Sequence, residues 1–210
     1  QWTTVLTGGP GTGKTTAVAG LLALLAEQAE HAGARPLRIA LTAPTGKAAA
    51  RLQGAVADAS TRLPQAYRDR LGELPAATLH RLLGVRPDNA TRFRHDRSNH
   101  LPHDVIVVDD TSMVSLTMMA RLLEAVRPDT RLVLVGDPDQ LASVEAGAVL
   151  SDLVAGLGAA PRATNPPAGQ DRSPVAALRT AHRYGQEIGA LADALRGGDA
   201  DAVLAALRSG

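Results

Sequence analysis

Short apolar runs alternate along this chain with longer stretches whose apolar residues recur at helical spacing. The short runs are rich in leucine and β-branched residues and predict strands at residues 3–7, 37–42, 105–108 and 131–135. The longer stretches predict helices at residues 16–29, 48–57, 116–126, 148–157, 186–195 and 202–207. Runs such as 105–108, which have no polar alternation, suit strands that are buried on both faces. The order of the elements therefore predicts an α/β fold: a mostly parallel sheet with helices on both faces.

Composition narrows the class of protein. The chain has 210 residues, enough for one sizeable α/β domain or a domain with a small appendage. It contains no cysteine, which excludes disulfides and thiolate metal sites, and no apolar stretch approaches the ~20 residues of a membrane span. The formal net charge of +1 points to no partner by itself. No signal peptide is visible, so we expect a cytoplasmic protein, and the start at Gln1, almost directly on a core strand, leads us to expect a fragment.

Residues 8–15 follow the pattern G-x-x-x-x-G-K-[ST] and lie between a predicted strand and a predicted helix, the context of a phosphate-binding loop rather than of a Gly-rich turn with a solvated lysine. The glycines let backbone N–H groups approach a polyphosphate at the helix N-terminus, where the helix dipole favours negative charge. We expect Lys14 to reach the outermost phosphates and Thr15 to ligate a bridging magnesium ion. The candidate nucleotide-binding residues are Gly8, Gly9, Pro10, Gly11, Thr12, Gly13, Lys14, Thr15 and Thr16.

Polar side chains follow two of the later predicted strands. Asp109 stands at the C-terminal end of the run 105–108, where a carboxylate can hold magnesium directly or through water. Asp110 comes next and could orient or deprotonate an attacking water, although an acidic pair that only solubilises a turn is the alternative. Gln140 follows the run 131–135 in a turn that contains Gly and Pro. Its amide can sense a γ-phosphate or the attacking water without adding charge.

Six segments of the chain form a specific set when they are taken in order. They are GGPGTGKT (8–15), APTGKAAARL (43–52), TLHRLLG (78–84), VVDDTSMV (107–114), VGDPDQLASVEAG (135–147) and AHRYG (181–185). The set resembles the superfamily 1B DNA helicases, and most closely the RecD family, which contains the alpha subunit of exodeoxyribonuclease V. The resemblance covers nearly the whole chain, from residue 5 to about residue 196, and its first and fifth segments together are the most specific.

The resemblance implies a RecA-like P-loop NTPase fold and an ATP-dependent 5′-to-3′ DNA helicase motor that acts in double-strand break repair and recombination. It implies ATP and Mg²⁺ as cofactors, and as partners single-stranded DNA or DNA ends and the beta and gamma subunits of exodeoxyribonuclease V, with no membrane. Lys14 and Thr15 look like the nucleotide and magnesium residues, Asp109 like the magnesium carboxylate, and Gln140 like the γ-phosphate sensor. Arg183 looks like the arginine that neutralises charge on the transferred phosphoryl group.

The chain departs from the family at Asp110, where the family usually has a glutamate as general base. Aspartate is one methylene shorter, and a misplacement of ~1 Å can reduce a rate on the order of a hundredfold. In the family a second RecA-like domain follows the first, and we expect it to follow residue 210 here. We expect residues 1–196 to form the first motor domain, with a small basic insertion within about 58–103, and residues 197–210 to begin the connection to the second domain. The fragment is expected to bind ATP weakly and not to unwind DNA alone.

Residues 62–103 are basic, with eight arginines against four acidic residues. An irregular basic segment suits a track for DNA phosphates, and the alternative is a solvated surface insertion. In the RecD family, the segments that resemble residues 43–52 and 78–84 lie along single-stranded DNA. The candidates for contacts to the DNA backbone are Thr45, Lys47, Thr78 and His80.

Other interpretations stay open on the sequence. A stand-alone RecD-like helicase, or the helicase part of a conjugative relaxase, would share these motifs, and sequence beyond residue 210 would separate them. A P-loop kinase or small-molecule phosphotransferase would need an acceptor pocket and a lid. A non-catalytic nucleotide-binding module is favoured by the short carboxylate of Asp110.

Overall fold

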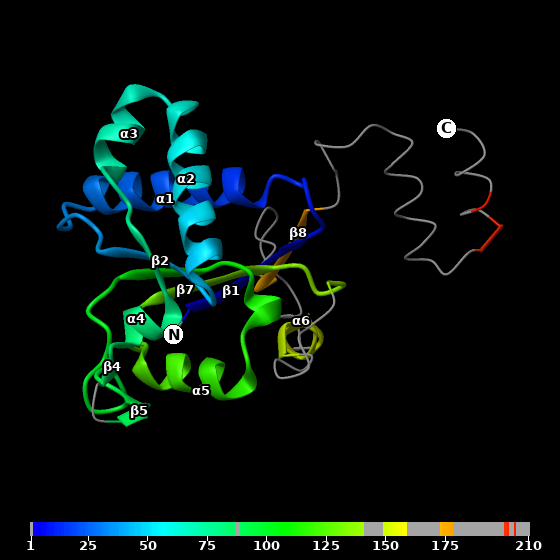
Figure 1. The fold of residues 1–210 in the computed structure, drawn as a ribbon. Helices are drawn as coiled ribbons and strands as arrows, with labels where there is room; N and C mark the ends of the chain where they lie inside the picture. Colours follow the sequence, from blue (N-terminus) through cyan, green and yellow to red (C-terminus); the bar gives the residue numbers. More distant parts are fainter. Residues whose placement is uncertain are drawn as a thin grey trace, which may run out of the picture.

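The structure is a computed structural model, and it describes residues 2–86, 89–140, 149–158, 173–178, 200, 201 and 204. Six parallel strands form its central sheet in the order β3-β2-β6-β7-β1-β8 (Figure 1). The strands are β1 (Trp2–Gly8), β2 (Ile39–Ala43), β3 (Ala76–Thr78), β6 (Val105–Val108), β7 (Arg131–Gly136) and β8 (Val175–Leu178). Every strand pair in this sheet is parallel, which confirms the fold class that the alternation of strands and helices predicts.

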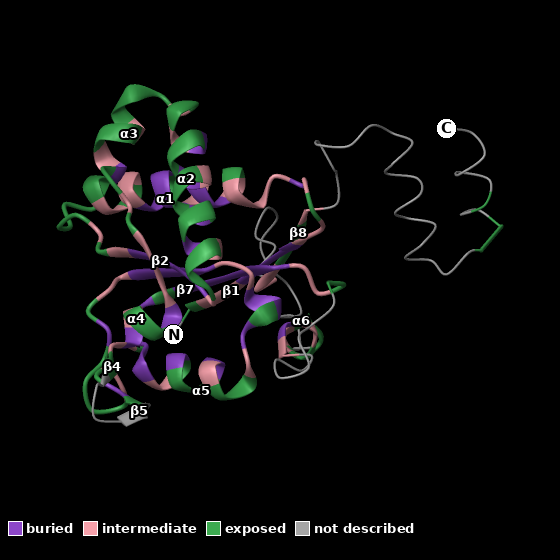
Figure 2. Cartoon of the chain, in the orientation of Figure 1, coloured by how far each residue is buried: buried purple, intermediate pink, exposed green. Residues whose placement is uncertain are grey.

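Helices cover both faces of the sheet (Figure 1). One layer contains α1 (Lys14–His31), α2 (Gly46–Thr61) and α3 (Gln65–Leu71), and the other contains α4 (Leu79–Leu83), α5 (Leu116–Ala125) and α6 (Val149–Gly158). Alternate residues of β6 serve the two layers: Val105 and Val107 pack with the α1 layer, whereas Ile106 and Val108 pack with the α5 layer. Figure 2 shows the buried residues concentrated along the sheet and the helix surfaces that touch it. This burial on both faces is why β6 is apolar without interruption.

The strands predicted at residues 3–7, 37–42, 105–108 and 131–135 are confirmed as β1, β2, β6 and β7. The helices predicted at residues 16–29, 48–57, 116–126 and 148–157 are confirmed as α1, α2, α5 and α6, with ends that shift by a few residues. The helix expected at residues 186–195 lies outside the described residues, and so does most of the one expected at 202–207. Among the described residues, no helix is both long and apolar enough to cross a membrane.

The basic segment between α2 and β6 has more regular structure than its composition suggests. It contains α3, β3, α4 and a small antiparallel hairpin of β4 (Val85–Arg86) and β5 (Asn89–Phe93). β3 pairs with β2 as the edge strand of the central sheet, and Leu79 and Leu83 of α4 are fully buried. Part of this segment therefore belongs to the core, because β3 forms one edge of the sheet and α4 buries two leucines.

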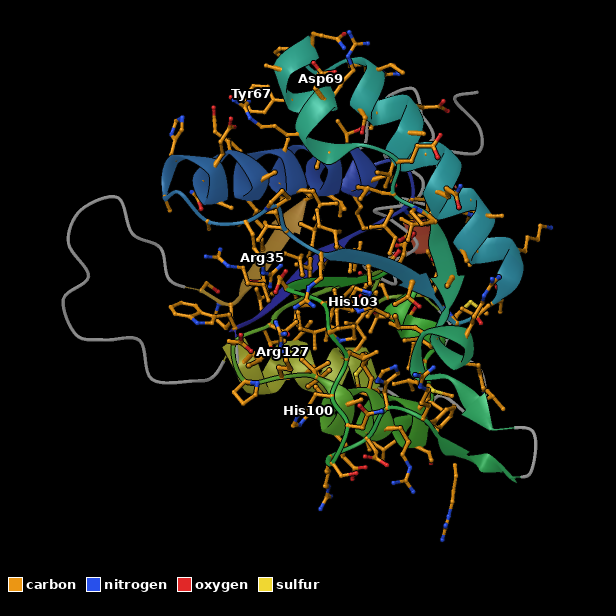
Figure 3. All side chains as sticks on the ribbon, turned by 90° about the vertical axis from the view of Figure 1, so that its left-hand side faces the viewer. Arg35, Tyr67, Asp69, His100, His103 and Arg127 are labelled. Carbon is orange, nitrogen blue, oxygen red and sulfur yellow. The ribbon has the colours of Figure 1, made fainter. Side chains whose placement is uncertain are left out.

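An ion cluster lies at the N-terminal ends of β2, β6 and β7, at the edge opposite the phosphate-binding loop. Asp104, directly before β6, accepts hydrogen bonds from the side chains of Arg35 (2.8 Å) and Arg127 (2.9 Å) and from the backbone N–H of Arg38 (2.9 Å). Arg35 and Arg127 are labelled in Figure 3. The cluster ties together the starts of three strands.

Candidate nucleotide site

The sheet order brings together the three chain segments that were predicted to handle phosphate. β7 lies between β1 and β6, and all three strands run in the same direction. The segments that follow them are residues 9–13 after β1, 109–113 after β6 and 137–140 after β7. These segments meet at the carboxyl edge of the sheet, which is where open α/β sheets bind ligands.

The loop between β1 and α1 is wrapped around the side chain of Lys14. The ammonium donates hydrogen bonds to the carbonyl oxygens of Gly8 (2.5 Å) and Gly9 (3.0 Å). Gly11 (φ 76°) and Gly13 (φ 85°) adopt the left-handed conformation that turns the loop back over the lysine. Gly13 caps α1 without a side chain, so the first N–H groups of the helix are left for an anion. An ammonium has three donors, and the third remains for a phosphate oxygen.

Gly8 is the point where this loop packs against its neighbours. A Cβ atom on Gly8 would lie 2.5 Å from the hydroxyl oxygen of Thr12 and 2.9 Å from the carbonyl oxygen of Leu178 in β8. The Thr12 hydroxyl in turn donates to the carbonyl oxygen of Gly9 (2.9 Å). The loop thus packs against β8, a strand that the sequence analysis missed.

Asp109 lies at the end of β6 with a partly buried carboxyl group. Its backbone N–H donates to the carbonyl oxygen of Thr42 in β2 (2.9 Å). Burial raises the pKa of the Asp109 carboxyl, the charge of Asp110 also raises it, and the cationic groups of Arg51 and Lys14 oppose that rise. A carboxylate that is partly removed from water, with a cation nearby and beside a candidate phosphate-binding loop, is suited to bind a metal ion.

Asp110 has a left-handed backbone, with φ 48° and ψ 41°. Within the described part of the chain it is the one non-glycine residue with a positive φ. It stands directly before the 3₁₀ helix η1 (Thr111–Met113), and its carbonyl oxygen accepts a hydrogen bond from the N–H of Met113 (2.9 Å). Aspartate tolerates this conformation better than most residues because its short side chain is compatible with it. Backbone strain of this kind gathers at functional sites.

Gln140 belongs to the turn that follows β7. Its backbone N–H donates to the carbonyl oxygen of Asp137 (3.2 Å), and its side-chain oxygen Oε1 accepts a hydrogen bond from the hydroxyl of Ser112 (3.0 Å). Gly136 permits this contact, since a Cβ there would lie 2.6 Å from Leu150 and 3.4 Å from the backbone nitrogen of Ser112. Sequence reasoning gave Ser112 no role, although it lies in the segment 107–114 that also carries Asp109 and Asp110.

The donor set fits a magnesium ion shared with a nucleotide. Thr15, in the first turn of α1, supplies a hydroxyl and Asp109 a carboxylate, the oxygen ligands that Mg²⁺ prefers. Among the described residues, no three His, Cys, Asp or Glu side chains gather into a metal site of their own. Mg²⁺ is commonly bound by one or two protein ligands together with substrate phosphates. Arg183, the remaining catalytic candidate, lies outside the described residues.

The candidates for DNA contact lie at the same edge of the sheet, beyond β6. Thr45 caps α2 by accepting a hydrogen bond from the N–H of Ala48 (3.2 Å), and Thr78 caps α4 by accepting one from the N–H of Arg81 (3.2 Å). The pairing of Ala43 with Thr78 brings the two caps to adjacent strand ends. Lys47 and His80 are exposed beside them. Both threonine hydroxyls therefore stabilise helix ends.

Comparison with known proteins gives consistent matches. Residues 1–146 match the AAA domain family. The chain is 68% identical over all of its 210 residues to a Mycolicibacterium smegmatis protein named RecBCD enzyme subunit RecD, of which it covers 36%. It is 43% identical over 146 residues to the ATP-dependent RecD2 DNA helicase of Deinococcus radiodurans, covering 68% of this chain and 16% of that protein. A crystal structure of Bacteroides sp Pif1 in complex with ADP-AlF4 aligns with a TM-score of 0.48 and 20% identity, covering 96% of this chain and 44% of that one.

The chain thus spans about a third of the length of the Mycolicibacterium smegmatis relative. The matched family covers the phosphate-binding loop, the strand that carries Asp109 and the turn that carries Gln140. The chain belongs to the AAA domain family, and over its whole length it is similar to proteins named RecBCD enzyme subunit RecD.

Proposed function

We propose that this chain is the first motor domain of an ATP-dependent RecD-type DNA helicase. The observation that carries the proposal is the order β6-β7-β1, which brings the Lys14 loop, the Gln140 turn and Asp109 to one edge of the sheet. A pocket for a triphosphate needs a cradle, a metal carboxylate and a γ-phosphate contact, and each comes from a different strand end here. Relatives named as RecD subunits and as a RecD2 DNA helicase support the link to DNA.

Each side chain of the site has a role in hydrolysis. Lys14 and the N–H groups at the start of α1 hold the β- and γ-phosphates. Thr15 and Asp109 would hold Mg²⁺, which would neutralise charge on the phosphates. Asp110 accepts a proton from the attacking water, and the amide of Gln140 donates to the γ-phosphate. Arg183 is proposed to supply a further positive charge to the transferred phosphoryl group.

The wider assignment follows from the RecD resemblance. We propose that residues 1–196 form the motor domain, that the segment within about 58–103 carries a basic DNA-facing part, and that residues 197–210 lead to a second motor domain. The proposed partners are single-stranded DNA or DNA ends and the beta and gamma subunits of exodeoxyribonuclease V. The proposed activity is 5′-to-3′ translocation in double-strand break repair, in the cytoplasm. A helicase moves by closing two such domains on a nucleotide, so this chain alone is expected to hydrolyse ATP weakly.

The test compares Mg²⁺-dependent binding of a fluorescent ATP analogue, and ATP hydrolysis with and without single-stranded DNA, in the parent and in Lys14→Ala. We expect the substitution to abolish binding and hydrolysis, and DNA to raise the hydrolysis of the parent. Arg121→Ala is the matched control, because it removes one exposed cation from α5, and it should retain both activities.

Hydrolysis that survives Lys14→Ala would contradict the proposal. Binding that Lys14→Ala abolishes, in a parent that never hydrolyses ATP even with DNA, would instead identify a non-catalytic nucleotide-binding module. Phosphoryl transfer to a small-molecule acceptor that is insensitive to DNA would identify a phosphotransferase.

A further inference from the structure

One side-chain hydrogen bond joins the turn after β6 to the turn after β7. The hydroxyl of Ser112 donates to Oε1 of Gln140 across 3.0 Å. An amide oxygen can only accept, so the hydroxyl of Ser112 is the donor in this bond. Ser112 is buried, with 6% of its surface exposed, so water competes little for its hydroxyl.

Both turns have backbones that are held in place. On the Ser112 side, the hydroxyl of Thr111 donates to the carbonyl oxygen of Val108 (3.0 Å), and the N–H of Val114 donates to the carbonyl oxygen of Thr111 (3.0 Å). On the other side, the Ser151 hydroxyl in α6 donates to the carbonyl oxygen of Pro138 (3.0 Å). The turns that carry Ser112 and Gln140 therefore both have a defined backbone.

We propose that Ser112 is a positioning residue that holds the Gln140 amide in place beside the nucleotide. The inference rests on the proposed function, in which Gln140 contacts the γ-phosphate. The two ends of a glutamine amide have nearly the same shape, but one donates and the other accepts. Phosphate oxygens only accept, so Nε2 attracts them and Oε1 repels them. By engaging Oε1, Ser112 leaves Nε2 free for the phosphate.

A comparison of the affinities for a triphosphate and for a diphosphate isolates the effect of Ser112 on the γ-phosphate contact. The test measures the affinities of the chain for a non-hydrolysable ATP analogue and for ADP, both with Mg²⁺, by equilibrium titration. Ser112→Ala should weaken binding of the ATP analogue about five- to tenfold, the loss of one charge-assisted hydrogen bond. ADP has no γ-phosphate, so its affinity should stay within about twofold of the parent, which also reports that the variant is folded.

Three further variants separate positioning from general support of the turn. Ser112→Thr keeps the hydroxyl and should restore the preference for the triphosphate. Ser151→Ala removes a hydroxyl that bonds the backbone of the same turn but leaves the Gln140 amide paired, and it should keep the parental preference. In a Gln140→Ala background, Ser112→Ala should add no further loss, because its effect passes through the amide.

Several results would overturn the inference. A parent that prefers the ATP analogue to ADP, with the same preference in Ser112→Ala, would refute the role of Ser112 and leave the proposed function intact. Equal losses for both nucleotides would mean structural support alone. A parent that binds both nucleotides equally would refute the contact between Gln140 and the γ-phosphate, and this inference with it, while the test with Lys14→Ala decides the proposed function separately.

Discussion

The guanidinium of Arg35 donates two hydrogen bonds of 2.8 Å, one to each carboxylate oxygen of Asp104. This bidentate pair, with the backbone N–H of Arg38 and the side chain of Arg127, holds the pKa of Asp104 well below its usual range. Only 15% of the Asp104 side chain is exposed. Asp104→Asn should therefore lower the free energy of unfolding at pH 7 by about 2 kcal/mol, measured by urea denaturation.

The pH dependence of that loss checks its cause. Because the folded pKa of Asp104 is depressed, its contribution is complete above the unfolded value of about 4 and declines as the pH falls below it. The difference in the free energy of unfolding between the parent and Asp104→Asn should therefore become smaller as the pH falls over the same range. Asp129→Asn is the control, because the Asp129 carboxylate also pairs with Arg127 but is 75% exposed. This substitution should change the free energy of unfolding by less than about 0.5 kcal/mol. A constant gap at all pH values would assign the loss to packing.

Gly8 is predicted to be intolerant of any side chain. Its replacement by alanine forces Cβ to within 2.5 Å of Thr12 and 2.9 Å of the backbone of Leu178, so the loop or β8 must move. We expect a loss of about 1–3 kcal/mol in thermal unfolding and a weaker affinity for Mg²⁺-nucleotide. Gly20→Ala is the control: a Cβ at Gly20, in the middle of α1, meets nothing within 4 Å and should stabilise the helix by up to about 1 kcal/mol. Unchanged nucleotide binding in Gly8→Ala would count against the packing argument.

The left-handed backbone of Asp110 predicts opposite effects on stability and on turnover. Asp110→Gly should raise the free energy of unfolding by about 0.5–1 kcal/mol, because glycine adopts this conformation without strain, and should reduce ATP hydrolysis. Asparagine also tolerates the left-handed backbone, so Asp110→Asn should leave the free energy of unfolding unchanged and reduce only ATP hydrolysis. Asp110→Glu should raise hydrolysis several-fold by moving the carboxylate closer to the water, with a lower melting temperature. No rise in steady-state hydrolysis in the presence of DNA would contradict the role of general base.

Asp109 should oppose folding in the absence of ligand. Its pKa is raised by burial, so the folded state binds a proton more tightly than the unfolded state, and stability falls as the pH rises through this carboxyl's titration range. Asp109→Asn should therefore raise the melting temperature at neutral pH without nucleotide. It should also abolish the stabilisation by Mg²⁺-nucleotide, about 2.7 kcal/mol at a hundredfold excess over Kd. Asp58→Asn, an exposed carboxylate on α2, should change neither quantity.

The core strands and the phosphate-binding loop could be predicted from the sequence because local pattern and tertiary role agree there. β6 is buried on both faces, so its four residues are all apolar, and nothing but a strand suits so short a run followed by Asp109. The loop 8–15 has glycines at the two positions where a positive φ is needed, Gly11 and Gly13. Positions of this kind can be recognised from the local sequence, without knowledge of the residues they contact.

Other features depend on partners that are distant in sequence. β8 is four residues long and only partly buried, and it becomes a strand by pairing with β1 from the other end of the chain. The left-handed turn at Asp110 and the bond from Ser112 to Gln140 result from the approach of η1 to β7. Arg86 and Phe93 belong to a hairpin too short to show an alternating pattern.

The position of β1 between β7 and β8 also determines when the nucleotide pocket can form. β1 leaves the ribosome before both of its neighbours in the sheet, β7 (residues 131–136) and β8 (residues 175–178). During synthesis the loop that follows β1 lacks its contact with β8 until residue 178 has emerged. Strand pairings this distant in sequence form slowly. Nucleotide therefore cannot assist the early steps of folding, and it can stabilise only a chain in which β8 is already paired with β1.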